Sequence, residues 1–126
     1  MAKVKTKKFT KRSLPPEIRL SVKASQAKKA EDILVLDLRE ISSFTDFFVI
    51  MTGNSSRQNV AIFESIEKEL KRGKLAPIGV EGKGHAEWIL MDYGSFVVHV
   101  FSKSAREYYS LEKLWGDAPK VVYAAR

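Results

Sequence analysis

The sequence predicts one α/β domain whose mixed, five-stranded sheet is flanked by helices. The expected elements follow the order helix, strand, strand, helix, strand, strand, strand, helix, which is typical of this fold class. Residues 47–51 form a continuous apolar run, as expected for a central strand covered on both faces. A chain of 126 residues is long enough for a single core. We expect a disordered basic arm at residues 1–13, the folded domain at 14–117 and a tail at 118–126.

The first half of the chain predicts a helix, two strands and a second helix. Prolines at 15 and 16 suit the first turn of a helix over 15–29, and apolar residues follow at four-residue spacing. Residues 33–38 are rich in branched apolar side chains and predict a short strand. After the 47–51 strand, Ser55 and Gln58 have the spacing of a capping box, and Gly73 is placed to end the helix. That helix carries an apolar stripe of Val60, Ile62, Phe63, Ile66 and Leu70.

The second half predicts three strands and a last helix. Residues 77–80 form a short strand, and residues 88–93 and 96–101 form a hairpin around Gly94-Ser95. Ser104 and Glu107 repeat the capping-box spacing at the start of the last helix. Apolar side chains continue along that helix at Tyr108, Leu111, Leu114 and Trp115.

The charge of the chain is concentrated at its N-terminus. Residues 1–30 carry a net charge of +9, whereas residues 31–126 carry −2. A segment with charge of a single sign repels itself and is attracted to polyphosphate, so we expect the arm to contact RNA or to act as a solubilising tail. The absence of cysteine excludes disulfides and thiol catalysis. No apolar run approaches the ~20 residues that span a bilayer, and no apolar segment follows the basic N-terminus, so we expect a cytoplasmic protein.

The residues that carry chemistry do not form a catalytic set. The Gly53-Asn54-Ser55-Ser56 corner offers backbone N–H groups to an anion, but it lacks the lysine of a P-loop, and a structural cap is the favoured interpretation. Asp37, Asp46 and Asp92 could gather at strand ends, although the last two are placed as turn formers. The spacing of His85 from Glu87 is not that of a zinc site. His99 is expected to be packed within its strand. We therefore predict no catalytic residue, no metal and no cofactor.

The strand at 88–93 predicts a protein interface. Alternation places Trp88, Leu90 and Asp92 on one face, and Glu87, Ile89, Met91 and Tyr93 on the other. Both faces are rich in large apolar groups, whereas three helices must cover the whole sheet. An apolar patch that remains uncovered, with charged residues around it, is typical of a surface that binds another protein. The expected rim is Glu87, Asp92, Glu112 and Lys113.

Seven segments taken in order resemble the ribosomal silencing factor (RsfS, Iojap-like) family over roughly residues 15–115. The segments are 29–37, 42–47, 52–58, 77–82, 87–94, 97–101 and 108–115. The resemblance implies a nucleotidyltransferase-like domain without enzyme activity that forms a homodimer. It also implies binding to the large ribosomal subunit through ribosomal protein uL-fourteen, steric exclusion of the small subunit, and repression of translation. The implied contact residues are Glu87, Trp88, Leu90, Asp92, Tyr108, Leu111 and Glu112.

Two other classes of function stay open from the sequence alone. A degenerate nucleotidyltransferase would use Gly53, Ser55 and a displaced carboxylate such as Asp37 or Asp92, and would bind nucleotide with Mg²⁺. A general RNA-binding protein driven by the arm would bind arbitrary RNA even when Trp88 is truncated.

Overall fold

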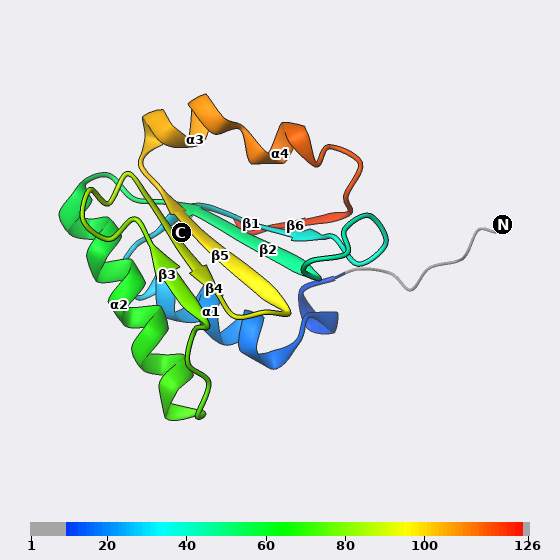
Figure 1. Cartoon of the computed structure of the whole chain (residues 1–126), viewed down its shortest axis with the longest axis horizontal. Helices are drawn as coiled ribbons and strands as arrows, with labels where there is room; N and C mark the ends of the chain where they lie inside the picture. Colours follow the sequence, from blue (N-terminus) through cyan, green and yellow to red (C-terminus); the bar gives the residue numbers. More distant parts are fainter. Residues whose placement is uncertain (1–9, 125–126) are drawn as a thin grey trace, which may run out of the picture.

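The computed structural model describes residues 10–124 as one mixed sheet with helices on both sides (Figure 1). A short 3-10 turn precedes the first helix, and the part of the predicted arm at residues 1–9 lies outside the described residues. The elements in chain order are η1 Lys11–Ser13, α1 Pro16–Gln26, β1 Glu31–Asp37, β2 Phe47–Thr52, α2 Ser56–Arg72, β3 Gly79–Glu81, β4 Trp88–Asp92, β5 Phe96–Phe101, α3 Lys103–Tyr109, α4 Leu111–Leu114 and β6 Lys120–Val122.

The strand order is β3-β4-β5-β2-β1-β6, and β2 and β5 form the one parallel pair in this sheet. All six residues of β2 are buried, which confirms the central position predicted from its continuous apolar run. The predicted hairpin is also confirmed. In it, β4 and β5 pair antiparallel with Leu90 opposite His99, and Gly94 has the positive φ of 88° that the tight turn requires.

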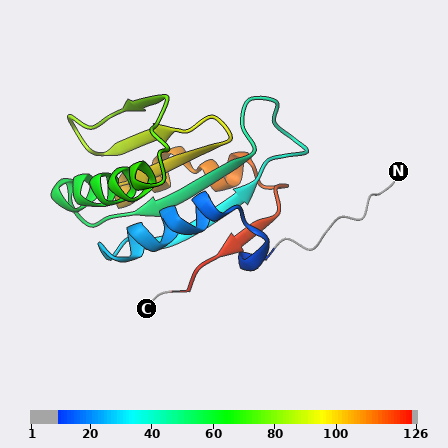
Figure 2. The same cartoon turned by 90° about the horizontal axis from the view of Figure 1, so that it is seen from below.

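Two cores lie on the two faces of the sheet, so the fold has three layers (Figures 1 and 2). Helices α1 and α2 cover the larger core, to which α1 contributes Ile18 and Val22, and α2 contributes Ile66 and Leu70. Helices α3 and α4 cover the smaller core on the opposite face. Alternation along β4 is confirmed, because Ile89 and Met91 enter the larger core whereas Trp88 and Leu90 pack against the smaller one.

The sheet has six strands rather than the predicted five. The additional strand, β6, lies within the segment expected to be a tail and pairs antiparallel with β1 through Leu34, Val35 and Leu36. Only three residues long and preceded by Pro119, it is too short to show an alternating pattern. Its central residue, Val121, is buried in the larger core, so the strand closes that edge of the apolar interior.

The predicted last helix is two helices, because Ser110 adopts a left-handed conformation with φ of 45°. The predicted capping box at Ser104 and Glu107 is wrong, since Ser102 is the N-cap and accepts a hydrogen bond from the Ala105 N–H at 3.1 Å. Helix α1 ends at Gln26, three residues earlier than expected. The Gly73 C-cap of α2 is confirmed.

Candidate protein-docking surface

Trp88 lies half-buried at the edge of the smaller core, with its ring packed between β5 and α3. It stacks at a tilt on Phe101 of β5, with ring centroids 5.0 Å apart, and on Tyr109 of α3, at 4.5 Å. Its indole Nε1–H donates a hydrogen bond of 3.0 Å to Nδ1 of His99. The single polar atom of the indole is therefore satisfied inside the protein, and the solvent-facing remainder of the ring is apolar.

His99 is the buried anchor of that arrangement, as the sequence predicted. It is 2% exposed, and its ring lies 4.4 Å from that of Phe48 in an edge-on contact. Burial lowers the pKa of His99 to about 3, so the imidazole is neutral at physiological pH. Because Nδ1 accepts from Trp88, the proton of the neutral ring belongs on Nε2, which is buried without a partner among the described residues.

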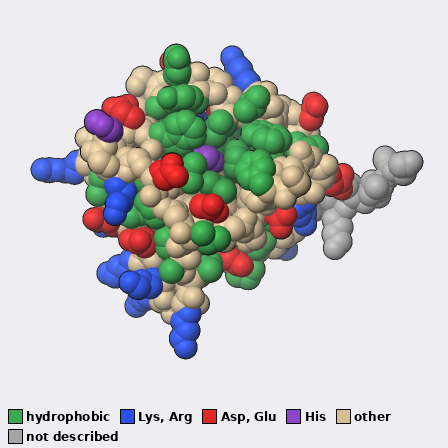
Figure 3. All heavy atoms as spheres, in the orientation of Figure 1, with side chains coloured by type: hydrophobic (Ala, Val, Ile, Leu, Met, Phe, Trp, Pro, Cys, Tyr) green, Lys and Arg blue, Asp and Glu red, His purple; other side chains and the backbone are tan. Residues whose placement is uncertain are grey.

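Further apolar side chains extend this surface across α3, α4 and the loop before β2. Tyr108 is 81% exposed, Leu114 71% and Phe44 63%, and the Phe44 ring lies 6.4 Å from that of Trp115. Figure 3 shows hydrophobic side chains gathered over this part of the molecule, with acidic groups among them. We call this surface the aromatic face; its members are Phe44, Trp88, Leu90, Tyr108, Tyr109, Leu111, Leu114 and Trp115.

Four of these members are absent from the contact residues expected from the sequence: Phe44, Tyr109, Leu114 and Trp115. Tyr109 follows Tyr108 directly, and both contribute to the aromatic face because α3 ends there, with their rings 5.0 Å apart. Phe44 reaches the face from a loop, through its contact with Phe48. The Ser42-Ser43-Phe44-Thr45-Asp46 turn sequence already marked Phe44 as a large apolar residue in a loop, which was the available signal.

The predicted acidic residues lie around the aromatic face, but they differ in the hydrogen bonds and ion pairs that they already form within the protein. Glu87 is exposed and accepts a hydrogen bond of 2.6 Å from Ser102 Oγ. Asp92 caps the hairpin by accepting from the Gly94 N–H at 2.8 Å, which confirms its predicted turn role. Glu112 forms an ion pair of 2.9 Å with Arg106, which also donates to Thr52 Oγ1. Glu112 therefore holds α4 against β2.

The serine corner is occupied by the protein's own side chains. Ser55 Oγ accepts from the Gln58 N–H at 3.0 Å, as in the predicted capping box. Its reciprocal half is wrong, because Gln58 Oε1 accepts from the Asn54 N–H instead of that of Ser55. The Gln58 amide also donates to the carbonyls of Lys28 and Lys29. Two backbone donors that an anion would need are thus already used, which supports the structural interpretation of the corner.

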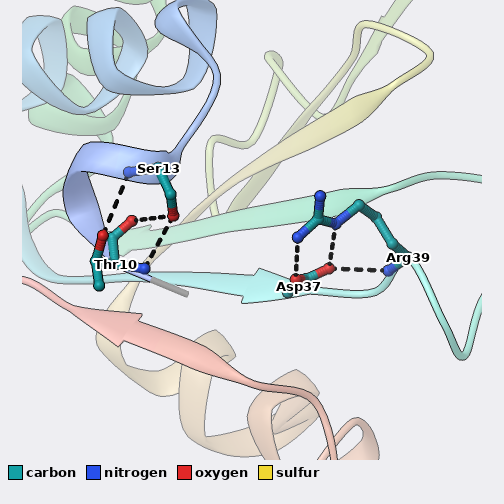
Figure 4. Close-up of polar contacts among 4 residues, drawn as sticks. All are labelled: Thr10, Ser13, Asp37 and Arg39. Atoms are coloured by element: carbon teal, nitrogen blue, oxygen red, sulfur yellow. Dashed lines mark hydrogen bonds and ion pairs between the residues drawn. The ribbon is translucent and has the colours of Figure 1, made fainter. Parts of the chain in front are cut away.

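Two of the three candidate aspartates, Asp37 and Asp92, take local hydrogen-bonding roles. Asp37 binds Arg39 through both of its oxygens, at 2.9 Å to Nε and 2.7 Å to a terminal nitrogen (Figure 4). Burial alone would raise the pKa of Asp37, but the hydrogen bonds and charge of Arg39 more than offset it and hold that pKa below its usual value. Within residues 10–124, no group of three or more His, Asp or Glu side chains could hold a metal ion.

No helix in the described part of the chain has the length and apolar character to cross a bilayer.

The chain shares its sequence and fold with a family of known proteins. Residues 11–125 match the family described as "Ribosomal silencing factor during starvation". The match thus extends past residue 115 and includes β6.

Individual relatives agree with the family match. Ribosomal silencing factor RsfS of Halalkalibacterium halodurans is 45% identical over 104 residues, which cover 82% of this chain and 89% of that protein. Ribosomal silencing factor RsfS of Bacillus subtilis is 45% identical over 102 residues, covering 81% and 86%. A crystal structure from Chromobacterium violaceum superposes with a TM-score of 0.77 at 36% identity, covering 79% of this chain and 83% of that one. The chain belongs to the ribosomal silencing factor family.

Proposed function

We propose that this protein uses the aromatic face to bind ribosomal protein uL-fourteen on the large ribosomal subunit, and that it thereby excludes the small subunit. It would act in the cytoplasm as a repressor of translation rather than as an enzyme. The observation that carries the proposal is the state of Trp88, whose ring is partly exposed while its N–H is satisfied by His99. Docking would bury more of this ring without leaving a polar atom unpaired, so desolvation adds little cost.

The neighbouring side chains support a protein partner. Tyr108, Leu114 and Phe44 add exposed apolar area around Trp88, and contiguous patches of this kind favour association. Glu87 and Asp92 retain oxygens that can pair with basic groups of a partner, which would set orientation and association rate more than affinity. Glu112 is engaged by Arg106, so we expect it to contribute by holding α4 in place. Leu90 and Leu111 would fill the area between these groups.

Steric exclusion is tested by mixing the protein with large subunits, adding small subunits, and following the formation of whole ribosomes by sedimentation. Trp88→Ala should weaken binding to large subunits by on the order of 2 kcal/mol, or about 30-fold in Kd, and restore joining. Tyr108→Ala should also weaken binding, and it should keep the fold because the Tyr108 side chain is exposed.

Ile78→Ala is the matched control for these substitutions. Ile78 is 75% exposed, and alternation places it with Val80, which packs against the opposite core. Its truncation should leave binding and joining unchanged. Unimpaired joining at saturating wild-type protein would refute steric exclusion, and equal effects of Ile78→Ala and Tyr108→Ala would refute the aromatic face as the contact.

Two further parts of the proposal concern assembly and the arm. We propose a homodimer, which light scattering coupled to size exclusion would detect as twice the chain mass.

We also propose that the basic arm contacts ribosomal RNA. Deleting residues 1–12 should then flatten the salt dependence of subunit binding, and an unchanged slope would refute the contact.

A further inference from the structure

We propose that a surface hollow formed by η1, α1 and Tyr123 binds the phosphodiester backbone of RNA. The hollow has a volume of about 410 Å³, and its polar lining consists of Lys11, Arg12, Arg19, Lys23, Gln26 and Tyr123. Four of these six side chains are cations, and no carboxylate lines the hollow. The choice of RNA as the anion rests on the proposed ribosomal function, whereas the preference for a polyanion follows from the lining itself.

The four cations have no anionic partner in the described part of the chain. Ion pairs among residues 10–124 join Arg39 to Asp37, Arg72 to Glu69, and Arg106 to Glu112. Glu31 and Asp32, at the start of β1, line the adjoining hollow instead, and Glu17 of α1 is not in the lining. Like charges gathered without counter-charges repel one another, so binding of phosphate groups would relieve this repulsion.

A second charged hollow, on α2, shows that such a concentration of unpaired cations is not general on this surface. It is lined by Lys68, Lys71 and Arg72, but Glu64 and Glu67 lie among them. The α2 hollow has three cations and two carboxylates, a formal net charge of +1. The hollow beside Tyr123 has four cations and no carboxylate, a formal charge of +4. The contrast also supplies a matched control, because two cations can be removed from each helix: Arg19 and Lys23 from α1, and Lys68 and Lys71 from α2.

The backbone that presents the cations is held in place by specific contacts. The Thr10 N–H donates to Ser13 Oγ at 3.0 Å, and the Ser13 N–H donates to Thr10 Oγ1 at 3.3 Å, which closes the η1 turn (Figure 4). Leu14, directly after that turn, is buried in the larger core. Lys11 Nζ lies 4.6 Å from the centre of the Tyr123 ring in a cation–π contact. Ordered cations lose less entropy on binding than free ones.

The lining favours single-stranded RNA over a lipid surface. The apolar side chains of α1, including Ile18 and Val22, are buried in the core, so this helix has no free apolar face to insert among lipids. The half-buried ring of Tyr123 lines the hollow beside the cations, and its exposed part can contact a base.

The test measures binding of a fluorescein-labelled single-stranded RNA of mixed sequence to the full chain over a series of salt concentrations. Each phosphate contact contributes about 0.7 to the slope of log affinity against log salt. The double variant Arg19→Gln/Lys23→Gln should therefore have a slope shallower by about 1.4 and an affinity roughly tenfold lower at 0.1 M salt. Both residues are exposed on α1, and glutamine suits a helix, so the fold should be kept.

Lys68→Gln/Lys71→Gln is the control, since it removes the same charge from exposed positions of α2 and should change the slope by much less. Equal effects of the two double variants would overturn the site, because binding would then follow net charge alone. Competition by poly-glutamate as effective as that of unlabelled RNA would also overturn it. The assay contains no ribosomes, so its result is independent of subunit joining and of Trp88→Ala.

Discussion

Mild acid is expected to destabilise this fold through a single side chain, His99. Burial lowers the pKa of His99 from 6.5 to about 3. The unfolded chain therefore takes up a proton as the pH falls below 6.5, whereas the folded protein does not until about pH 3. Because the unfolded state binds more protons in this window, the contribution to stability is complete above pH 6.5 and is lost progressively as the pH falls.

The size of the effect follows from the two pKa values. One pKa unit corresponds to about 1.4 kcal/mol, so the unfolding free energy should fall by about 2 kcal/mol between pH 7 and pH 5. The lowered pKa of Asp37 acts in the same direction but in a different window. Its contribution is present above the ordinary carboxyl pKa of 3.8 and is lost only at lower pH. Measurements above pH 5 therefore isolate the histidine.

Urea denaturation followed by tryptophan fluorescence at several pH values measures this dependence. His99→Gln keeps a hydrogen-bond acceptor for the Trp88 indole but cannot take up a proton, so the slope of unfolding free energy against pH should flatten between pH 7 and 5. His85→Gln is the control, because His85 lies exposed in the loop before β4. A slope in His99→Gln equal to that of the wild type would refute the reasoning.

Two predictions concern stability elsewhere in the fold. Gly82→Ala should cost on the order of 3 kcal/mol in a urea titration, because φ is +88° and a Cβ would lie 1.9 Å from the Trp88 carbonyl oxygen. Gly84→Ala, in the same loop with nothing within 4 Å, should be neutral, and equal losses would contradict this. Burial, with the charge of Glu67, raises the pKa of Tyr93 to about 12, so stability should fall as the pH rises above 10. Tyr93→Phe should abolish that loss of stability at high pH. It should also raise stability at pH 7 by about 1 kcal/mol, because the hydroxyl is buried without a partner among residues 10–124. An unchanged loss of stability above pH 10 in Tyr93→Phe would contradict this prediction.

Much of the fold was predictable because its strands and helices carry strong local patterns. The apolar run at residues 47–51 can be buried only in the middle of a sheet, and β2 lies there. The Gly94-Ser95 turn fixes the register of β4 and β5, and that register brings Trp88 and His99 to neighbouring positions on one face. The hydrogen bond between them could therefore have been predicted from the sequence, although it was not.

The remaining features depend on contacts between distant parts of the chain. A segment such as Lys120-Val121-Val122 becomes a strand because β1 offers it a partner, and no local pattern records that partner. The apolar spacing of Tyr108, Leu111 and Trp115 continues across Ser110, so the left-handed residue that divides the helix leaves no signal. Phe44 belongs to the aromatic face because of Phe48 and Trp115, and a turn sequence cannot show those neighbours.

The pairing of β6 with β1 limits where the chain can safely be shortened or fused. A version that ends at residue 117, the boundary expected from the sequence, would strip Leu34, Val35 and Leu36 of their outer partner strand. The row of backbone donors and acceptors uncovered on β1 would offer a template for intermolecular pairing and precipitation. Expression work on this family member should therefore retain residues 118–124 and attach any C-terminal affinity tag through a polar spacer.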